Sequence, residues 1–200
     1  YCPLRGIEVS EYPDIILPVM LKATFHFGEG TLKISMSETV AQSLVNLTKI
    51  KIYNDTASGG MALQSSTILG EAGPAVTIKL IESQRIKLIK LSGTLGGDGT
   101  PLMLKVLKGA FSDLGRNQQE SATLQGVAAI EEIPDLTGPI LLKAHLFFSN
   151  RSLILNWNET INASVRTRVN LSNIFIGSDR SDFSLPVIGG VVKTTKSVRL

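Results

Sequence analysis

The sequence predicts an all-β protein made of two tandem antiparallel β-sandwich domains, Ig-like or jelly-roll-like, that arose by internal duplication. Three observations lead to this fold class: a long internal repeat, apolar residues that alternate with polar ones, and turn residues at short intervals. With 43% apolar and 18% charged residues, the 200-residue chain can bury a core and is not disordered by composition.

The repeat is displaced by a constant 121 positions along the chain. Residues 11–40 match residues 132–161 at 11 of 30 positions, and most mismatches keep their apolar character. The match extends back to residues 6–7 facing 126–127, and forward to 51–53 facing 173–175 after a one-residue gap. We therefore expect a first domain over residues 1–118 and a shorter second domain over 119–200, which repeats about residues 6–80.

The first strands of each copy follow from period-2 alternation. In residues 17–27 every second residue is apolar, so these side chains lie on one face of the strand. Residues 32–36 alternate apolar and polar residues in the same way. Residues 153–157 alternate in the same phase, so the same face points inward in both copies. Residues 28–30 and 149–151 form the turns that join these strands.

The remaining strands are expected as short runs between turn signals, with residues 76–82 and 85–91 forming a tight hairpin around Ser83-Gln84. Residues 37–47 are ambiguous, since Ser37 and Glu38 resemble a helix cap and favour a helical turn. The other expected strands are residues 47–53, 61–69, 102–107, 124–130, 174–176 and 191–199.

The second copy is shorter, because nothing in it corresponds to residues 85–111. A sandwich that lacks strands exposes unpaired backbone, which another chain can cover by adding a strand. We expect the N-terminal segment of one molecule to pair with the incomplete second domain of the next. The residues expected in this interface strand are Gly6, Ile7, Glu8, Val9 and Ser10.

Asn-x-Ser/Thr triplets are the strongest compositional signal. Six of the nine asparagines begin such a triplet, and none has proline in the middle position. The pattern favours N-glycosylation of a secreted or surface protein; the alternative is that asparagine beside threonine is common on β-surfaces and stays unmodified. The candidate glycosylation sites are Asn46, Asn54, Asn150, Asn158, Asn162 and Asn170.

No pattern in the sequence predicts an enzyme, a metal site or a cofactor. The single Cys2 excludes an internal disulfide, and residues 94–100 read as a wide turn because they lack the Gly-Lys-Ser/Thr ending of a phosphate loop. Calcium at Asp98, with Asp55 or Asp179, lacks the usual alternating aspartates. His26 and His145 stand at different positions of the repeat, which favours ordinary strand histidines over catalytic bases.

Charged residues offer two further alternatives. Glu38 and Glu159 recur in both copies, and a repeated turn contact is the simpler interpretation than a glycosidase carboxylate pair. Four cations fall in the expected hairpin, where they either form an anion-binding stripe or protect a sheet edge; we favour the edge. These cations are Lys79, Arg85, Lys87 and Lys90.

A net charge of +3 is too small to indicate nucleic acid, and no apolar run is long enough to span a membrane. No charged segment followed by an apolar run is seen, so we expect any secretion signal to have been removed. The organisation is similar to that of extracellular donor-strand filament subunits, such as archaeal threads and bundling pili. This resemblance implies a cell-surface homopolymer and assigns no functional residues. Alternatives are a secreted carbohydrate-binding or adhesion module and a virion or envelope structural protein.

Overall fold

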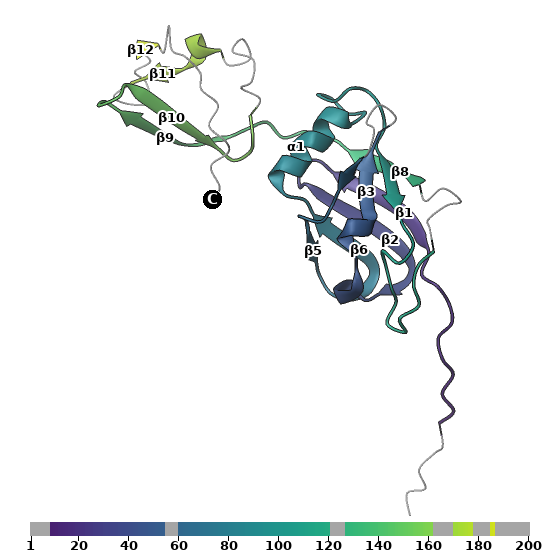
Figure 1. Cartoon of the computed structure of the whole chain (residues 1–200). Helices are drawn as coiled ribbons and strands as arrows, with labels where there is room; N and C mark the ends of the chain where they lie inside the picture. The colour runs from purple at the N-terminus through teal and green to yellow at the C-terminus, as the bar shows by residue number, and fades with distance from the viewer. Residues whose placement is uncertain (1–8, 55–59, 121–126, 162–169, 178–184, 187–200) are drawn as a thin grey trace, which may run out of the picture. The chain divides into compact units, whose positions relative to one another are not determined.

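The computed structural model describes residues 9–54, 60–120, 127–161, 170–177 and 185–186. The chain is mostly β and divides into two compact units, Tyr1–Leu136 and Thr137–Leu200 (Figure 1). The second unit thus begins at Thr137, later than the boundary after residue 118 that the sequence suggested.

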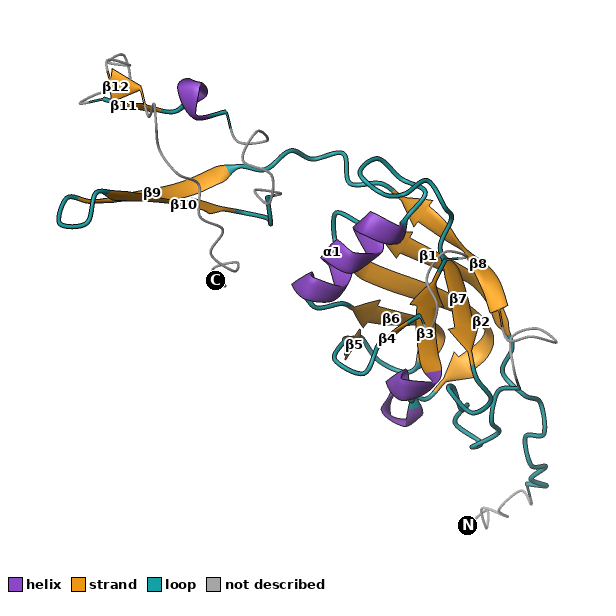
Figure 2. Ribbon diagram, turned by 45° about the horizontal axis from the view of Figure 1, so that its top comes forward, coloured by secondary structure: helices purple, strands orange, loops and turns teal. Residues whose placement is uncertain are grey.

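The first unit is a curled, eight-stranded mixed sheet with one α-helix packed against it (Figure 2). Its strands lie in the order β4-β3-β7-β8-β1-β2-β6-β5. The strands are β1 (Met20–His26), β2 (Thr31–Val40), β3 (Ile50–Tyr53), β4 (Met61–Ala62), β5 (Thr67–Leu69), β6 (Gly73–Lys79), β7 (Met103–Val106) and β8 (Val127–Ile133), and the helices are η1 (Gln42–Leu44), η2 (Leu47–Lys49) and α1 (Glu82–Leu91).

The core lies inside the curl, where the two halves of the sheet face each other. Phe25, Leu32 and Ile34 come from β1 and β2, and Ile52 and Leu104 come from β3 and β7; all five are fully buried. Their alternation with exposed residues is the pattern that predicted these strands. All strand pairs of this sheet are antiparallel except β1 and β8, which run parallel. The expectation of a purely antiparallel sheet is therefore wrong at this pair.

The expected hairpin around Ser83-Gln84 is wrong, because Glu82–Leu91 forms helix α1. The Gln84 side chain accepts a hydrogen bond from the Ile81 backbone N–H at 3.2 Å, which satisfies a donor at the start of the helix. Gln84, Arg85 and Leu88 are buried against the sheet at helical spacing. A helical turn lies within residues 37–47, as the 3-10 helix η1, but Ser37 and Glu38 do not cap it, because they belong to β2, which continues to Val40.

The described part of the second unit contains β9 (Leu141–Phe147), β10 (Ser152–Trp157), η4 (Leu171–Asn173), β11 (Phe175–Ile176) and β12 (Leu185–Pro186). Here β9 pairs with β10 and β11 with β12, each antiparallel. The strand expected over residues 191–199 lies outside the described residues.

The β9–β10 hairpin repeats the β1–β2 hairpin residue for residue. Met20 pairs with Met36 and Leu141 pairs with Trp157, with a register irregularity at the same place in both hairpins. The turn also repeats: Gly30 has φ 64° and its equivalent Arg151 has φ 55°. A duplication that preserves pairing, bulge and turn conformation explains why the sequence offset is constant.

Candidate functional site: an inserted strand and an open apolar groove

Strand β8 stands at the start of the second repeat in the sequence, yet it lies inside the sheet of the first unit. It runs parallel to β1 and antiparallel to β7, and so lies between them (Figure 2). Backbone N–H groups of Phe27 and Ile130 donate to the carbonyls of Ile133 and Leu102, both at 3.0 Å. The sequence assigned residues 124–130 to the second copy; the described part of this stretch, residues 127–130, instead helps to complete the sheet of the first unit.

The side chains of β8 fit this position on both faces. Ile130 is 5% exposed and belongs to the core. On the outer face the Glu131 carboxylate accepts hydrogen bonds from Lys22 and Thr24, both at 2.8 Å, and these bonds lower the pKa of Glu131. The next carboxylate, on Glu132, accepts backbone N–H bonds from Gly93 at 3.0 Å and Leu102 at 2.6 Å. The inserted strand is therefore an integral part of the first unit.

A buried arginine holds the end of β8 in place. Arg85 on α1 is 7% exposed, and its guanidinium contacts both carboxylate oxygens of Glu82 at 2.8 Å. It also donates to the Phe27 carbonyl at 3.1 Å and lies 3.4 Å from a carboxylate oxygen of Asp135, just after β8. Arg85 thus links α1, the end of β1 and the connection that leaves β8.

The N-terminal segment carries the sequence pattern that β8 has in the second repeat. At the offset of 121 positions, residues 9–12 correspond to residues 130–133 of β8, and Pro13-Asp14 corresponds to Pro134-Asp135. Val9 is 76% and Tyr12 is 88% exposed, and the segment leading back from β1 extends away from the sheet (Figure 1). Gly6, Ile7 and Glu8 lie outside the described residues, while Val9 and Ser10 are described and exposed.

The face of β9 that corresponds to the first unit's core is open. Phe25 is fully buried and Phe27 is 1% exposed, whereas their equivalents Leu146 and Phe148 are 40% and 85% exposed. Among the described residues, β9 has a strand partner on its β10 side only. A groove of about 530 Å³ lies over this face, and its lining is Leu141, Ala144, Leu146, Leu153, Leu155, Trp157 and residues 173–177.

Four of the candidate glycosylation sites are exposed: Asn46, Asn150, Asn158 and Asn170. Asn54 differs, because it is 1% exposed and its side-chain nitrogen donates to the Leu91 carbonyl and to Asp98, both at 2.8 Å. A glycan on that nitrogen would remove both bonds. Asn162 lies outside the described residues.

At two of the exposed sites the asparagine accepts hydrogen bonds from the Ser or Thr of its own triplet. The side-chain oxygen of Asn46 accepts hydrogen bonds from the Thr48 N–H at 3.1 Å and the Thr48 hydroxyl at 2.6 Å. Asn150 accepts the corresponding bonds from Ser152 at 3.2 and 2.6 Å. The side-chain nitrogen, which would carry a sugar, takes no part in these bonds.

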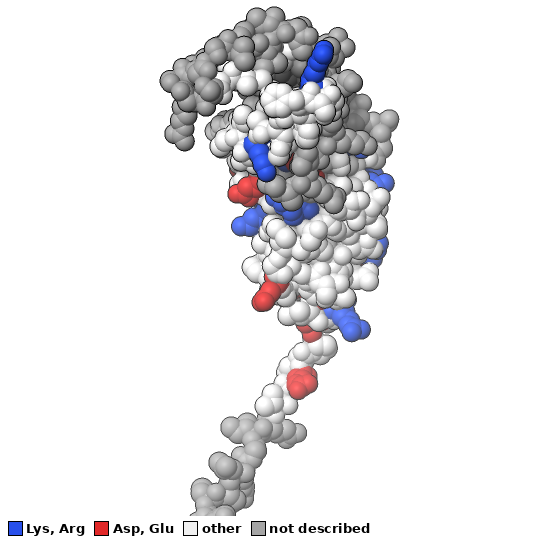
Figure 3. Space-filling model, turned by 90° about the vertical axis from the view of Figure 1, so that its left-hand side faces the viewer, with Lys and Arg blue, Asp and Glu red and all other residues white. Residues whose placement is uncertain are grey.

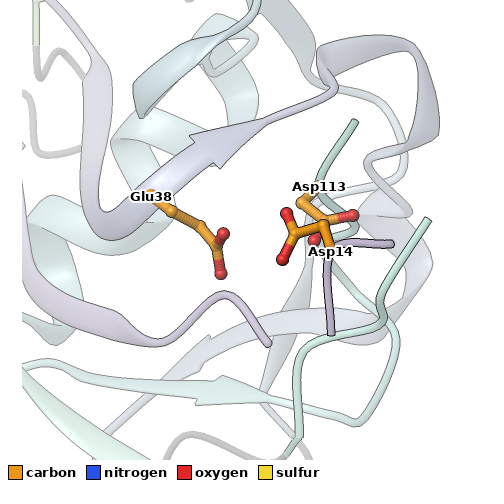
Figure 4. Close-up of side chains that lie close together, drawn as sticks. All are labelled: Asp14, Glu38 and Asp113. Atoms are coloured by element: carbon orange, nitrogen blue, oxygen red, sulfur yellow. The ribbon is translucent and has the colours of Figure 1, made fainter. Parts of the chain in front are cut away.

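Three carboxylates, on Asp14, Glu38 and Asp113, lie close together in the first unit (Figure 4). Oxygen atoms of Asp14, Glu38 and Asp113 lie within 4.8 Å of one another, and one oxygen of Glu38 is buried without a hydrogen-bond partner. Burial and then the charges of Asp14 and Asp113 raise the pKa of Glu38 above its ordinary value. The sequence identified Glu38 through its repeat partner Glu159 but missed Asp14 and Asp113, which only tertiary structure brings to it.

Asp113 is the buried member of this acidic cluster, at 2% exposed. Its two carboxylate oxygens accept hydrogen bonds from the backbone and side chain of Asn117, at 2.7 and 2.8 Å. The Asn117 side chain also donates to the Asp14 carbonyl at 3.0 Å. These bonds tie the base of the N-terminal segment to the loop after β7, which gives the cluster a structural role.

The other sequence candidates that the structure describes lie in a turn or in strands. Asp98 accepts from Asn54 at 2.8 Å and from the Thr100 N–H at 2.9 Å, so its oxygens serve the turn after α1. Asp55 and Asp179 lie outside the described residues, as does Cys2. His26 lies in β1. His145 lies in β9, where its ring stacks on that of Phe147, with 6.3 Å between the ring centroids.

The four cations of the expected hairpin do not form one stripe. Lys79 lies on β6, Arg85 is buried in its ion pairs, and Lys87 and Lys90 are exposed on α1. On the face shown in Figure 3, charged side chains are sparse and of both signs. None of the described helices is long and apolar enough to cross a membrane.

Comparisons with protein-family models, with curated proteins and with solved structures found no match for this chain. The functional conclusion therefore depends on the chain's own geometry.

Proposed function

We propose that this protein is a structural subunit of an extracellular filament that polymerises head to tail by β-strand donation. The observation that carries the proposal is β8, a strand from the start of the second repeat that lies between β7 and β1 in the sheet of the first unit. The chain thus already contains one donated strand. Residues 9–12 of the N-terminal segment have the same sequence pattern, and Val9 and Tyr12 are exposed.

Strand donation between copies follows from the repeat. The second unit carries the β9–β10 hairpin with its core face open, and the segment that would fill it precedes β1 in the sequence. Such an interface joins different surfaces of two subunits, so pairing without closure generates a filament. With the strand added, the β9–β10 hairpin becomes a three-stranded arrangement equivalent to β8-β1-β2 of the first unit.

The exposed sequons support a location outside the cell. Asn46, Asn150, Asn158 and Asn170 are accessible to modification, and glycans there would supply polar cover for a surface with few charges. The proposal includes no catalytic role and no cofactor; the partners are further copies of the chain and covalent N-glycans.

Electron microscopy of native protein tests the proposal, together with a variant that lacks residues 1–10. We expect fibres from the full chain, and folded monomers without fibres from the deletion variant. Intact mass of the native material should exceed the chain mass in hexose steps. Fibres that survive the deletion, or native protein that remains monomeric at all concentrations, would refute strand donation.

A secreted carbohydrate-binding module is the second candidate, favoured by Trp157 in the groove of the second unit. On this alternative the protein is monomeric and binds members of a glycan panel, and Trp157→Ala abolishes that binding.

A further inference from the structure

We propose that the donated N-terminal strand occupies the free edge of β9, parallel to β9, with Val9 of the second copy beside Ala144. This inference rests on the proposed function and adds to it the edge, the direction and the register of the contact.

The edge and the direction follow from the first unit. There β8 lies on the side of β1 opposite β2 and runs parallel to β1. Because β9–β10 reproduces the pairing of β1–β2 at every equivalent position, the corresponding strand lies on the side of β9 opposite β10. This is the edge that has no strand partner among the described residues.

The register follows from the same equivalence. In the first unit Ala23, Thr24, Phe25 and His26 face residues 130–133. Each of these residues has an equivalent 121 positions away: those of β1 in β9, and those of β8 in the N-terminal segment. Replacing each residue by its equivalent places residues 144–147 beside residues 9–12 of the second copy, with Ala144 beside Val9 and His145 beside Ser10. Any slip by one residue would turn Val9 away from the groove.

The side chains fit this register on both faces. Ile130 is 5% exposed at the position that Val9 takes, and Ala144 lines the apolar groove that would receive Val9. On the outer face, Lys22 forms an ion pair with Glu131 at 2.8 Å. The equivalent of Lys22 is Lys143, which in this register lies beside Glu8 of the second copy. A pair of opposite charges is therefore kept, although Glu8 is not the residue equivalent to Glu131.

The connections to the donated strands also match. Residues 134–140 join β8 to β9, and residues 13–19 join the N-terminal segment to β1, with prolines at the same two positions. A second copy can therefore insert its strand and keep the spacing to its own body that the chain already uses between its repeats.

Disulfide trapping tests the register in filaments of the full chain. In a Cys2→Ser background, we combine Ser10→Cys with His145→Cys, whose equivalents Glu131 and Thr24 are in contact at 2.8 Å. The matched control combines Ser10→Cys with Asn156→Cys on β10. We expect a ladder of disulfide-linked oligomers from the first variant on a non-reducing gel, and background cross-linking from the control.

Mixing the two single-cysteine variants checks that the contact joins different molecules. Ser10→Cys and His145→Cys proteins, mixed and oxidised, should give covalent dimers. Absence of filaments from the Cys2→Ser protein would overturn the proposed function and this inference together. Filaments without the ladder, a cross-linked monomer, or equal cross-linking in the control would overturn the register while strand donation stands.

Discussion

Ile130 lies beside Ala23 in a parallel pair of strands, although the two residues belong to different copies of the repeat. Both are buried in one core. The first unit therefore uses a strand that the sequence alone would assign to the second.

Replacing Ile130 by alanine should lower the free energy of unfolding of the first unit by about 2–4 kcal/mol, because buried methyl groups are lost and a cavity remains. Urea unfolding followed by circular dichroism measures the change. Ala129→Ser on the exposed face of β8 is the control and should stay within about 0.5 kcal/mol of the natural protein. Equal effects of the two changes would mean that β8 is not part of the core.

Val9→Asp should abolish filaments and leave the fold unchanged. Val9 is 76% exposed in the single chain, so the substitution should change the free energy of unfolding by less than about 0.5 kcal/mol. In the filament the same side chain enters an apolar groove, where an unpaired carboxylate is strongly unfavourable. Sedimentation and negative-stain microscopy measure polymer. Ser10→Asp, on the outer face of the strand, should still polymerise, and loss of polymer from both variants would contradict the assigned faces.

Glu38→Gln should stabilise the first unit at neutral pH. Burial, Asp14 and Asp113 raise the pKa of Glu38 in the folded state, so the folded protein binds the Glu38 proton more tightly than the unfolded chain does. The stability from Glu38 is present below its ordinary pKa and is lost as pH rises through the raised folded value. Melting temperature between pH 4 and pH 8 should therefore fall less in Glu38→Gln than in the natural protein. Parallel curves for the two proteins would argue against this linkage.

Arg85→Met should cost about 3 kcal/mol, because it leaves Glu82 and Asp135 without their buried partner. Lys87→Met, two residues along the same helix and exposed, is the control and should have little effect. Urea unfolding of both variants distinguishes the buried ion network from a general loss of charge on α1. A small effect at Arg85 would show that the network adds little to stability.

Glycopeptide mass spectrometry of native protein should find sugars at Asn46, Asn150, Asn158 and Asn170 and none at Asn54. The difference follows from the buried Asn54 nitrogen and its two hydrogen bonds. Glycosylation of Asn54 at high occupancy, or bare asparagine at all four exposed sites, would contradict the assignment.

The sequence predicted what is local and repeated. Period-2 alternation located β1, β2 and β10, and the repeat predicted that the same kind of turn joins the first two strands of each copy, as it does in β1–β2 and β9–β10. Helix α1 was missed because apolar residues in 85–91 also fit alternation. The polar residues Gln84 and Arg85 are buried by tertiary hydrogen bonds that no local pattern reveals.

The membership of β8 could not be predicted either, because it depends on a pairing between distant parts of the chain. Hydrophobic pattern identifies a strand and its inward face but not which sheet receives it. The same holds for the acidic cluster, where Asp14, Glu38 and Asp113 come from three separate segments.

The parallel arrangement of β1 and β8 also determines how the first unit responds to tension. One connection enters at the start of β1, and the other leaves at the end of β8. Pulling on these two connections slides the neighbouring strands along each other in shear, which loads all their hydrogen bonds together instead of opening them one at a time. A thread whose subunits were joined by the same parallel geometry would resist extension at every junction through many bonds acting at once.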